Sequence, residues 1–404
     1  MIHSLLRIPL VFCLTLLPLA VQAQGGHAHQ PAKAAKKPAL ALGAAFAPDG
    51  ALWAVGLDAQ ARLEVRISAD DGRSWQAPRL LDTGGAAVAA DGESRPKLAF
   101  GPHGQVVVAY TTPLAKPYTG AIRLLRSTDG GATFAAPVTV HHDRQVITHR
   151  FESIAFDAHG KLHTVWVDKR DLELAKAAAP KSGGAKPSYR GAAIYRNVSV
   201  DGGATFGPDT KVADYSCECC RIALTQAPNG QVAALWRHVF APNIRDHAFA
   251  LLGDTAALAA PPVRATFDNW AVDACPHHGP ALTPAAGGGY HAVWFGEKAG
   301  VAQVRYGRLA PDGAPTGAVQ ALPDEQAEHA DVLSAGQRVA IVWRSFDGSG
   351  THLSAWVSED DGRHFTLRRL ARTEADSDYP VLLRKGAQLF VLWNTTEKRH
   401  VEAL

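Results

Sequence analysis

Methionine is nearly absent from this sequence of 404 residues, since its single copy is Met1. A copper site built from thioether sulfurs is therefore excluded for the rest of the chain. An excess of charge of one sign is also lacking, because 41 lysines and arginines are balanced by 38 aspartates and glutamates. The formal net charge of +3 gives no indication of a nucleic-acid-binding surface. Cysteine is scarce as well, with five copies.

Long hydrophobic runs are missing except at the N-terminus. Residues 1–23 combine Arg7, an apolar run and a small-x-small cleavage site, which is typical of a secretory signal peptide. The run is too short for a membrane span. Residues 24–39 are polar and of low complexity, which favours a disordered arm. We therefore expect a periplasmic or secreted protein without a membrane span.

Four copies of one short pattern, Ser-x-Asp-x-Gly-x-(Ser/Thr)-(Trp/Phe), occur along the chain, the last with His364 at the hydroxyl position. The Asp can accept hydrogen bonds from turn amides, and the Gly provides a backbone conformation that other residues resist. The aromatic residue is expected to pack under the hairpin. The pattern residues are Asp70, Gly72, Trp75, Asp129, Gly131, Phe134, Asp201, Gly203, Phe206, Asp360, Gly362 and Phe365.

A second repeat consists of an apolar strand, a Gly-containing turn and another apolar strand, which is the pattern of a β-hairpin. Seven such hairpins follow one another between residues 40–55 and 379–393. We predict one all-β domain over 40–404, a seven-bladed β-propeller with four-stranded antiparallel blades and an incomplete last blade. A six-bladed propeller is the alternative.

The four short copies resemble the Asp-boxes, or BNR repeats, of the sialidase superfamily and related β-propellers. This resemblance implies that each box joins the third and fourth strands of a blade, away from the functional face. It also implies three arginines for a substrate carboxylate, an acid/base Asp, and a Tyr nucleophile assisted by a Glu. The candidates for these catalytic roles are Tyr379, Glu152, Asp168, Arg150, Arg221 and Arg237. The Arg-Ile-Pro signature of sialidases occurs only at Arg7–Pro9, within the predicted signal peptide, so enzymatic activity stays uncertain.

In a propeller, the segments that lead into the innermost strands line one mouth of the central channel. Here these segments and the neighbouring loops are rich in Arg, His and Asp. We predict a ligand-binding face there, because functional loops gather on one side of a rigid scaffold. Salt bridges between blades are the alternative. The residues predicted for this face are Arg95, His149, Arg245, Asp246, Asp268, Trp270, His329 and Arg344.

The cysteines fall in two neighbouring segments of this kind. Cys217, Cys219 and Cys220 precede the fourth hairpin. Cys275, followed by His277 and His278, precedes the fifth. Two interpretations stay open. One is one or two disulfides, for instance from one of the first three cysteines to Cys275. The other is a Cu or Zn site of thiolates and imidazoles.

Three functions are compatible with these features. The first is an exported propeller that binds a ligand, such as a soft metal ion like copper or an anionic small molecule, on its Cys/His/Arg face. The second is an exo-sialidase or another glycoside hydrolase acting on an acidic sugar. The third is a scaffold for a protein partner, with disulfides as structural links. A propeller fold does not choose among them.

Overall fold

The structure, a computed structural model, describes residues 39–178, 191–253, 258, 260–274 and 276–404. The predicted signal peptide and all but the last residue of the predicted arm lie outside this range, and so does Cys275. No helix among the described residues is long and apolar enough to cross a membrane.

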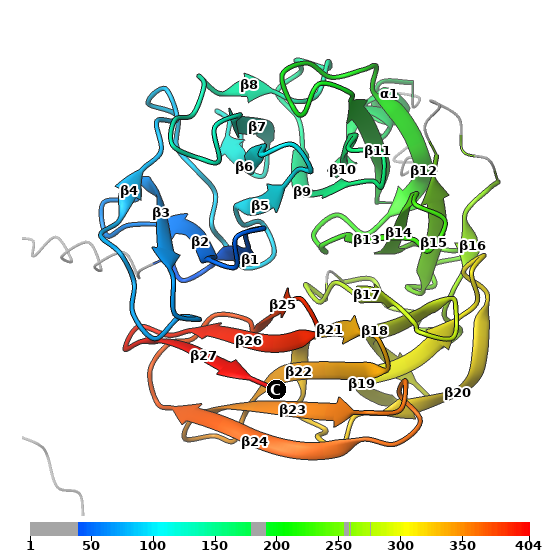
Figure 1. The fold of residues 1–404 in the computed structure, drawn as a ribbon. Helices are drawn as coiled ribbons and strands as arrows, with labels where there is room; N and C mark the ends of the chain where they lie inside the picture. The colour runs from blue at the N-terminus through cyan, green and yellow to red at the C-terminus, as the bar shows by residue number, and fades with distance from the viewer. Residues whose placement is uncertain (1–38, 179–190, 254–257, 259, 275) are drawn as a thin grey trace, which may run out of the picture. The chain divides into compact units, whose positions relative to one another are not determined.

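The described chain forms seven antiparallel sheets, which are the blades of a propeller (Figure 1). Blade 1 contains β1 (Gly43–Phe46), β2 (Leu52–Leu57), β3 (Leu63–Ser68) and β4 (Arg79–Leu80). Blade 2 contains β5 (Lys97–Phe100), β6 (Val106–Pro113), β7 (Gly120–Ser127) and β8 (Val138–Thr139). Blade 3 contains β9 (His149–Phe156), β10 (Leu162–Asp168), β11 (Ala192–Ser199) and β12 (Thr210–Ser216). Blade 4 contains β13 (Ala223–Gln226), β14 (Val232–Arg237), β15 (His247–Leu252) and β16 (Val263–Arg264).

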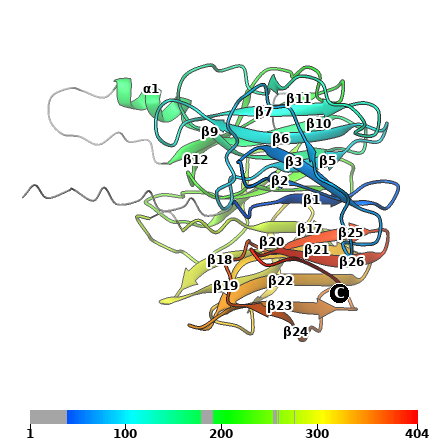
Figure 2. The same ribbon diagram turned by 90° about the vertical axis from the view of Figure 1, so that its left-hand side faces the viewer.

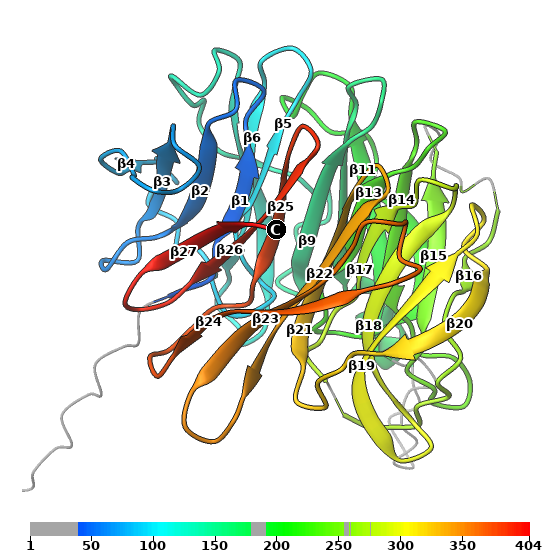
Figure 3. The same cartoon turned by 60° about the horizontal axis from the view of Figure 1, so that its bottom comes forward.

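The last three blades complete the ring. Blade 5 contains β17 (Ala281–Pro284), β18 (Tyr290–Lys298), β19 (Val301–Leu309) and β20 (Pro315–Ala321). Blade 6 contains β21 (Glu328–Ala335), β22 (Arg338–Phe346), β23 (Thr351–Ser358) and β24 (Thr366–Thr373). Blade 7 has three strands, β25 (Val381–Lys385), β26 (Gln388–Asn394) and β27 (Arg399–Ala403), with the C-terminus at the end of β27 (Figure 3).

The number of blades follows from the contacts of the innermost strands. Each innermost strand contacts the innermost strand of the next blade, and β25 contacts β1, so the ring is closed. The prediction of seven blades is therefore confirmed, and so is the incomplete last blade. The six-bladed alternative is wrong, because the first and last hairpins each form a separate sheet.

The hydrophobic core lies between the blades rather than within one layer. Seven clusters of buried residues each join two neighbouring blades. Strand β2 shows why. Its alternate residues Leu52 and Ala54 pack toward blade 7, whereas Trp53 and Val55 pack toward blade 2. Successive side chains of a strand point to opposite faces, so apolar strands without alternation become buried on both faces.

The four pattern copies all lie between the third and fourth strands of their blades, which are blades 1, 2, 3 and 6. In the first copy, the Asp70 carboxylate accepts hydrogen bonds from the amide and the hydroxyl of Ser74, at 2.8 and 2.6 Å. The Ser68 hydroxyl accepts a bond from the Gly72 amide at 2.8 Å. Equivalent contacts occur at 127–133, 199–205 and 358–364. The four glycines have φ between 79 and 93°, which only Gly adopts without strain. The aromatic residues are half-buried against the clusters between blades.

The segments that lead into the first strands and the loops between the second and third strands lie on the other side of the ring. In an antiparallel blade, the segment leading into the first strand and the loop between the second and third strands share one side. The structure therefore has a turn face, with the four pattern copies, and a mouth face, with the lead-in segments. Helix α1 (Arg170–Ala178) follows β10 on the mouth face and stands at the left of Figure 2.

Candidate functional site: the mouth face

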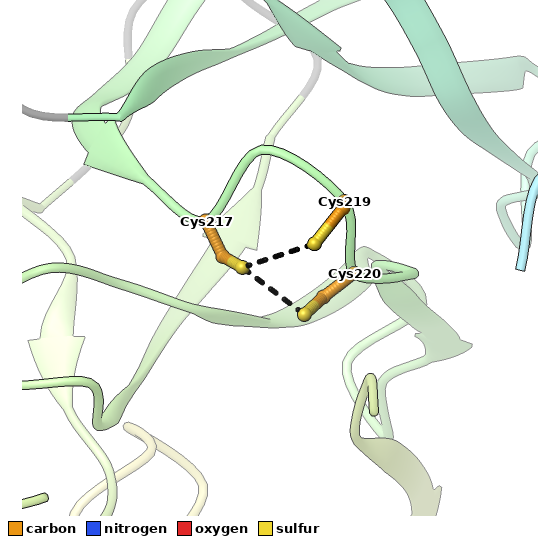
Figure 4. Close-up of side chains that lie close together, drawn as sticks. All are labelled: Cys217, Cys219 and Cys220. Carbon is orange, nitrogen blue, oxygen red and sulfur yellow. Dashed lines mark hydrogen bonds between the residues drawn. The ribbon is translucent and has the colours of Figure 1, made fainter. Parts of the chain in front are cut away.

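A cluster of three sulfurs lies in the segment that connects β12 to β13 (Figure 4). The sulfurs of Cys217, Cys219 and Cys220 all lie within 4.8 Å of one another, and we call them the sulfur cluster. The Cys217 sulfur is 3.1 Å from that of Cys220 and 3.8 Å from that of Cys219. All three side chains are buried and belong to the core between blades 3 and 4.

The thiols of Cys217 and Cys220 have opposite acidities. A hydrogen bond from the Cys220 thiol and the positive charges of Arg237 and Arg245 lower the pKa of Cys217 to about 6, despite burial. The same hydrogen bond and burial raise the pKa of Cys220 well above its usual value. The cluster therefore holds one thiolate and one thiol at neutral pH.

The described residues contain no complete disulfide. Cys217 and Cys220 are free thiols. Cys219 is not among the free thiols. The predicted disulfide to Cys275 stays a prediction, because Cys275 lies outside that range.

Four aromatic rings form a stack beside the sulfur cluster's segment, and we call it the ring stack. Tyr379 stacks on His329 with ring centroids 3.4 Å apart, and His329 stacks on His278 at 4.2 Å. Phe295 continues the stack beyond His278, at 4.4 Å. Burial lowers the pKa of His278 to about 3, and burial also lowers the pKa of His329. Both imidazoles are therefore neutral at neutral pH.

His278, His329 and Glu328 place potential ligand atoms within 4.8 Å of one another. The two imidazole rings, however, are stacked with an interplanar angle of 8°. Because the lone pairs of imidazole lie in the ring plane, two stacked rings direct them side by side rather than at one point. This group does not form a metal site without turning one ring. The predicted sulfur and imidazole ligands thus belong to two different groups, the sulfur cluster and the ring stack.

Glu93 is buried on the mouth face and connects the segment that leads into blade 2 with blades 4, 5 and 6. Its carboxylate accepts hydrogen bonds from the amides of Arg221 and Gly279, at 2.6 and 3.1 Å. His329 Nδ1 lies 3.5 Å from the other carboxylate oxygen. Burial would raise the pKa of Glu93, but the Arg221 charge and the His329 contact lower it far below its usual value. Glu93 is therefore an anionic anchor that holds the lead-in segments together.

A pocket of 460 Å³ opens on the mouth face, and we call it the mouth pocket. Its wall contains Cys219 of the sulfur cluster and Tyr379 of the ring stack. It also contains two ion pairs, Arg150 with Asp91 at 3.0 Å and Lys169 with Glu218. The other residues of the wall are Gly92, Glu93, Tyr118, Thr148, Phe151 and His277. The pocket offers aromatic surface, charges of both signs and access to one sulfur.

The arginines predicted to hold a substrate carboxylate are bound to protein groups. Arg221 bonds to Glu93 and to the carbonyls of Pro280 and Ala330. Arg237 donates only to backbone carbonyls, including those of His278 and Phe295, and its guanidinium lies over the Trp270 ring. Arg150 pairs with Asp91. These three guanidinium groups do not converge on a shared acceptor.

Tyr379 does lie at the mouth, between the guanidinium groups of Arg95 and Arg344 at 5.0 and 4.8 Å from its ring. Burial and the Glu93 charge raise its pKa, which disfavours a phenolate nucleophile. Glu152 is buried in blade 3, where burial raises its pKa and Thr111 donates to it. Asp168 lies elsewhere in that blade, bonded to Trp166 and Arg170.

The other predicted face residues mostly join neighbouring segments. Arg95 pairs with Asp378 at 2.8 Å, and Arg344 pairs with Glu328 at 2.9 Å. The remaining partners are Val272 for Arg245, Arg264 for Asp246, Trp294 for Asp268 and His141 for His149. Of these contacts, Arg95 with Asp378 is a salt bridge between blades, whereas Arg344 with Glu328 and Asp246 with Arg264 lie within one blade.

Two residues of the site escaped the sequence analysis. Glu93 is an anchor whose partners are distant in sequence, and Lys97 lines the central channel. The spacing of Cys217 and Cys220 was a usable signal, since they stand as Cys-x-x-Cys, a pattern of metal-binding and redox cysteine pairs.

Comparison with known proteins identifies the fold only. No protein-family model and no curated protein sequence matches the chain. Among solved structures, a Penicillium chrysogenum α-L-arabinanase covers 80% of this chain and 94% of its own, at 17% identity and a TM-score of 0.51. A polysaccharide lyase of family PL25, an ulvan lyase, covers 90% and 92%, at 11% identity and 0.52. A leech intramolecular trans-sialidase covers 89% and 84%, at 10% identity and 0.51. The chain thus has a sialidase-like β-propeller fold.

Proposed function

We propose that this propeller binds a soft metal ion, with Cu(I) as the preferred ion and Cys217 and Cys220 as ligands. Cys219 becomes a third ligand once its predicted disulfide is reduced. The observation that carries the proposal is the convergence of three buried sulfurs within 4.8 Å. Thiolates select Cu(I) and Zn(II), and the absence of methionine beyond Met1 leaves thiolate as the soft ligand type. Export by residues 1–23 belongs to this proposal, because an exported chain meets metal ions outside the cytoplasm.

The spacing of the sulfurs supports it. Metal–sulfur bonds of about 2.3 Å in a tetrahedral site place two sulfurs about 3.8 Å apart. The distance from Cys217 to Cys219 is 3.8 Å, and that from Cys217 to Cys220 is 3.1 Å and would lengthen on binding. The alternative explanation for the three close sulfurs is hydrophobic packing, since buried cysteine behaves as a small hydrophobic residue. Packing alone does not explain why three sulfurs meet in a chain that otherwise has so few.

The test is an anaerobic titration of the reduced protein with Cu(I) in competition with a chromophoric chelator. We expect one ion per chain, and release of the Cys220 proton, because ligands must be deprotonated. Cys217→Ser and Cys220→Ser should each weaken binding by a factor on the order of 1,000, if about 10–16 kcal/mol of metal affinity is shared by three thiolates. Cys217→Ala and Cys220→Ala repeat the test without burying a hydroxyl.

Two further variants sharpen the result. Cys219→Ser should leave affinity nearly unchanged in oxidised protein and lower it in reduced protein. His278→Gln is the matched control from the ring stack and should bind copper as the native protein does. Unchanged affinity in both Cys217→Ala and Cys220→Ala would refute the proposal.

A second candidate is the binding and cleavage of an acidic carbohydrate in the mouth pocket. The aromatic rings of Tyr118 and Phe151 and the cations Arg150 and Lys169 in its wall favour it. The similar propellers named above include enzymes that act on carbohydrates: an arabinanase bound to arabinobiose, an ulvan lyase, and a trans-sialidase bound to a sialic acid derivative. Turnover of a fluorogenic sialoside that is lost in Tyr379→Phe would support this candidate, whereas no turnover by native protein would dismiss the sialidase form of it.

A further inference from the structure

The central channel contains a closed-in space that the proposed metal site does not use. A cavity of 260 Å³ lies inside the ring of innermost strands and is lined by residues from all seven blades. It shares Glu93 and Tyr379 with the mouth pocket, so the two spaces adjoin. Access to the cavity from solvent is therefore through the mouth face.

One long charged side chain stands at a position that is small in four other blades. In these five blades, the residue at this position of the innermost strand pairs with the residue twelve positions later. In blades 6 and 7, Asp331 and Val381 pair with the residue eleven positions later. Lys97 holds this position in blade 2, and its counterparts are Gly43, Ser153, Ala223 and Ala281. All five line the cavity. The small counterparts leave the space that the lysine side chain and a ligand need.

The ammonium group of Lys97 makes no hydrogen bond or ion pair with any described residue. The other charged groups of the cavity wall are already bonded to protein groups. Arg95 pairs with Asp378, and Arg221 bonds to Glu93. Asp331 accepts hydrogen bonds from the amides of Val332 and Leu382. Lys97 thus lacks a hydrogen bond or a close ion pair in a partly desolvated space, although the carboxylates of Glu152 and Glu93 act on its charge at longer range.

A hydrogen-bond donor is also unused at this place. The hydroxyl of Tyr379 makes no hydrogen bond with the described residues, and Tyr379 lines both the cavity and the mouth pocket. The phenol is neutral at neutral pH, because burial and the Glu93 charge raise its pKa. It can therefore donate to an anion near the mouth of the channel.

We propose that the central channel binds one small oxyanion, such as phosphate, sulfate or a short carboxylate, on the ammonium of Lys97, with the Tyr379 hydroxyl as a donor. Burial and the Arg95 charge lower the pKa of Lys97 to about 8, although the charges of Glu152 and Glu93 act in the opposite direction. The site is separate from the sulfur cluster, so it stands or falls independently of metal binding.

The test is isothermal titration calorimetry of the full chain at pH 7 and low ionic strength, with inorganic phosphate, sulfate and acetate as probes. We expect saturable binding of one ion per chain. Lys97→Met should lower affinity at least tenfold, and Tyr379→Phe about threefold to tenfold, the value of one neutral hydrogen bond. Lys116→Met, an exposed lysine between β6 and β7 on the same face, is the matched control and should bind as the native protein does.

Lys97→Gln is a second variant for the case that the methionine variant does not fold. It should also lose the ion while keeping native Cu(I) affinity, which separates this test from that of the metal site. The preferred probe distinguishes an inorganic oxyanion from a carboxylate ligand. Equal binding by the Lys97 and Lys116 variants, or no saturable binding to the native protein in the millimolar range, would overturn the proposal.

Discussion

The turn face and the mouth face of the propeller stabilise their loops by different means. On the turn face, each Asp bonds to residues two to four positions away, as Asp129 does with Ser127 and Thr133. On the mouth face, some buried bonds join residues far apart in sequence, Glu93 with Arg221 at 128 positions and Arg95 with Asp378 at 283. The repeated face is a set of separate local turns, whereas the mouth face depends on closure of the whole ring.

Left-handed backbone occurs on both faces. On the mouth face, Phe151, His277 and His329 have φ of 56, 56 and 49°. On the turn face, the four pattern glycines take such conformations without strain, and the non-glycine residues Asp71 and Asp361 have φ of 58 and 60°. Strained backbone persists where surrounding contacts hold it. Backbone conformation therefore does not distinguish the two faces.

The largest expected effect on stability concerns the closure of the ring. Asp378 is buried, pairs with Arg95 and accepts a hydrogen bond from the Leu42 amide, which joins blades 7, 2 and 1. Asp378→Ala should lower the free energy of unfolding by about 3–5 kcal/mol, because it leaves a buried cation unpaired. Urea denaturation measures this. The exposed Glu374, paired with Arg372, is the control, and Glu374→Ala should change stability by less than about 0.5 kcal/mol. Similar losses in both variants would contradict the account.

A smaller effect is expected on the turn face. Asp129→Ala removes the carboxylate that holds one turn and should lower the free energy of unfolding by less than Asp378→Ala does, because the Asp129 carboxylate is exposed to solvent. Because the turn is local, Cu(I) affinity should stay at the native value. Urea denaturation and the copper competition assay, applied to the same variant, check both statements. A loss of copper binding would show that the two faces are coupled.

A third prediction concerns pH, and it applies to both faces. Burial lowers the pKa of His278 on the mouth face to about 3, and burial together with the Arg308 charge lowers that of His291 beside the Asp361 turn to about 4. Both values are below the unfolded value of about 6.5, so the unfolded state takes up protons first as the pH falls. Stability is therefore expected to decrease below pH 6.5, by up to about 1.4 kcal/mol per pH unit for each imidazole.

Urea denaturation at pH 7.5, 6.5 and 5.5 measures this slope. His278→Gln and His291→Gln should each flatten it, since each removes one imidazole that titrates only in the unfolded state. A slope that is unchanged in both variants would assign the pH dependence to other groups.

The scaffold could be predicted from the sequence because its signals are local and repeated. The seven hairpins predicted the number of blades, and the four pattern copies indicated where the third and fourth strands of their blades lie. The short stretch after Trp393 indicated one more strand, which is β27.

The site could be predicted only in part. The convergence of the three sulfurs followed from their proximity in sequence. The stacking of His278 on His329 could not be predicted, because it depends on which blades are neighbours and on where each ring lies along the channel axis. The pairing of Arg95, Arg150, Arg221 and Arg237 with protein groups was not visible either, because their partners lie in other blades or in the backbone. Residue types alone predicted a charged face, and only the three-dimensional contacts show which charges are already used.

The central claim is that the sulfur cluster coordinates a soft metal ion. X-ray absorption at the copper K-edge of the reduced, Cu(I)-loaded protein tests it most directly, because the spectrum identifies the atoms bound to the metal. The account predicts sulfur as the nearest neighbour, with fewer sulfurs in Cys217→Ala and Cys220→Ala. A first shell made of nitrogen and oxygen, unchanged in these variants, would contradict it.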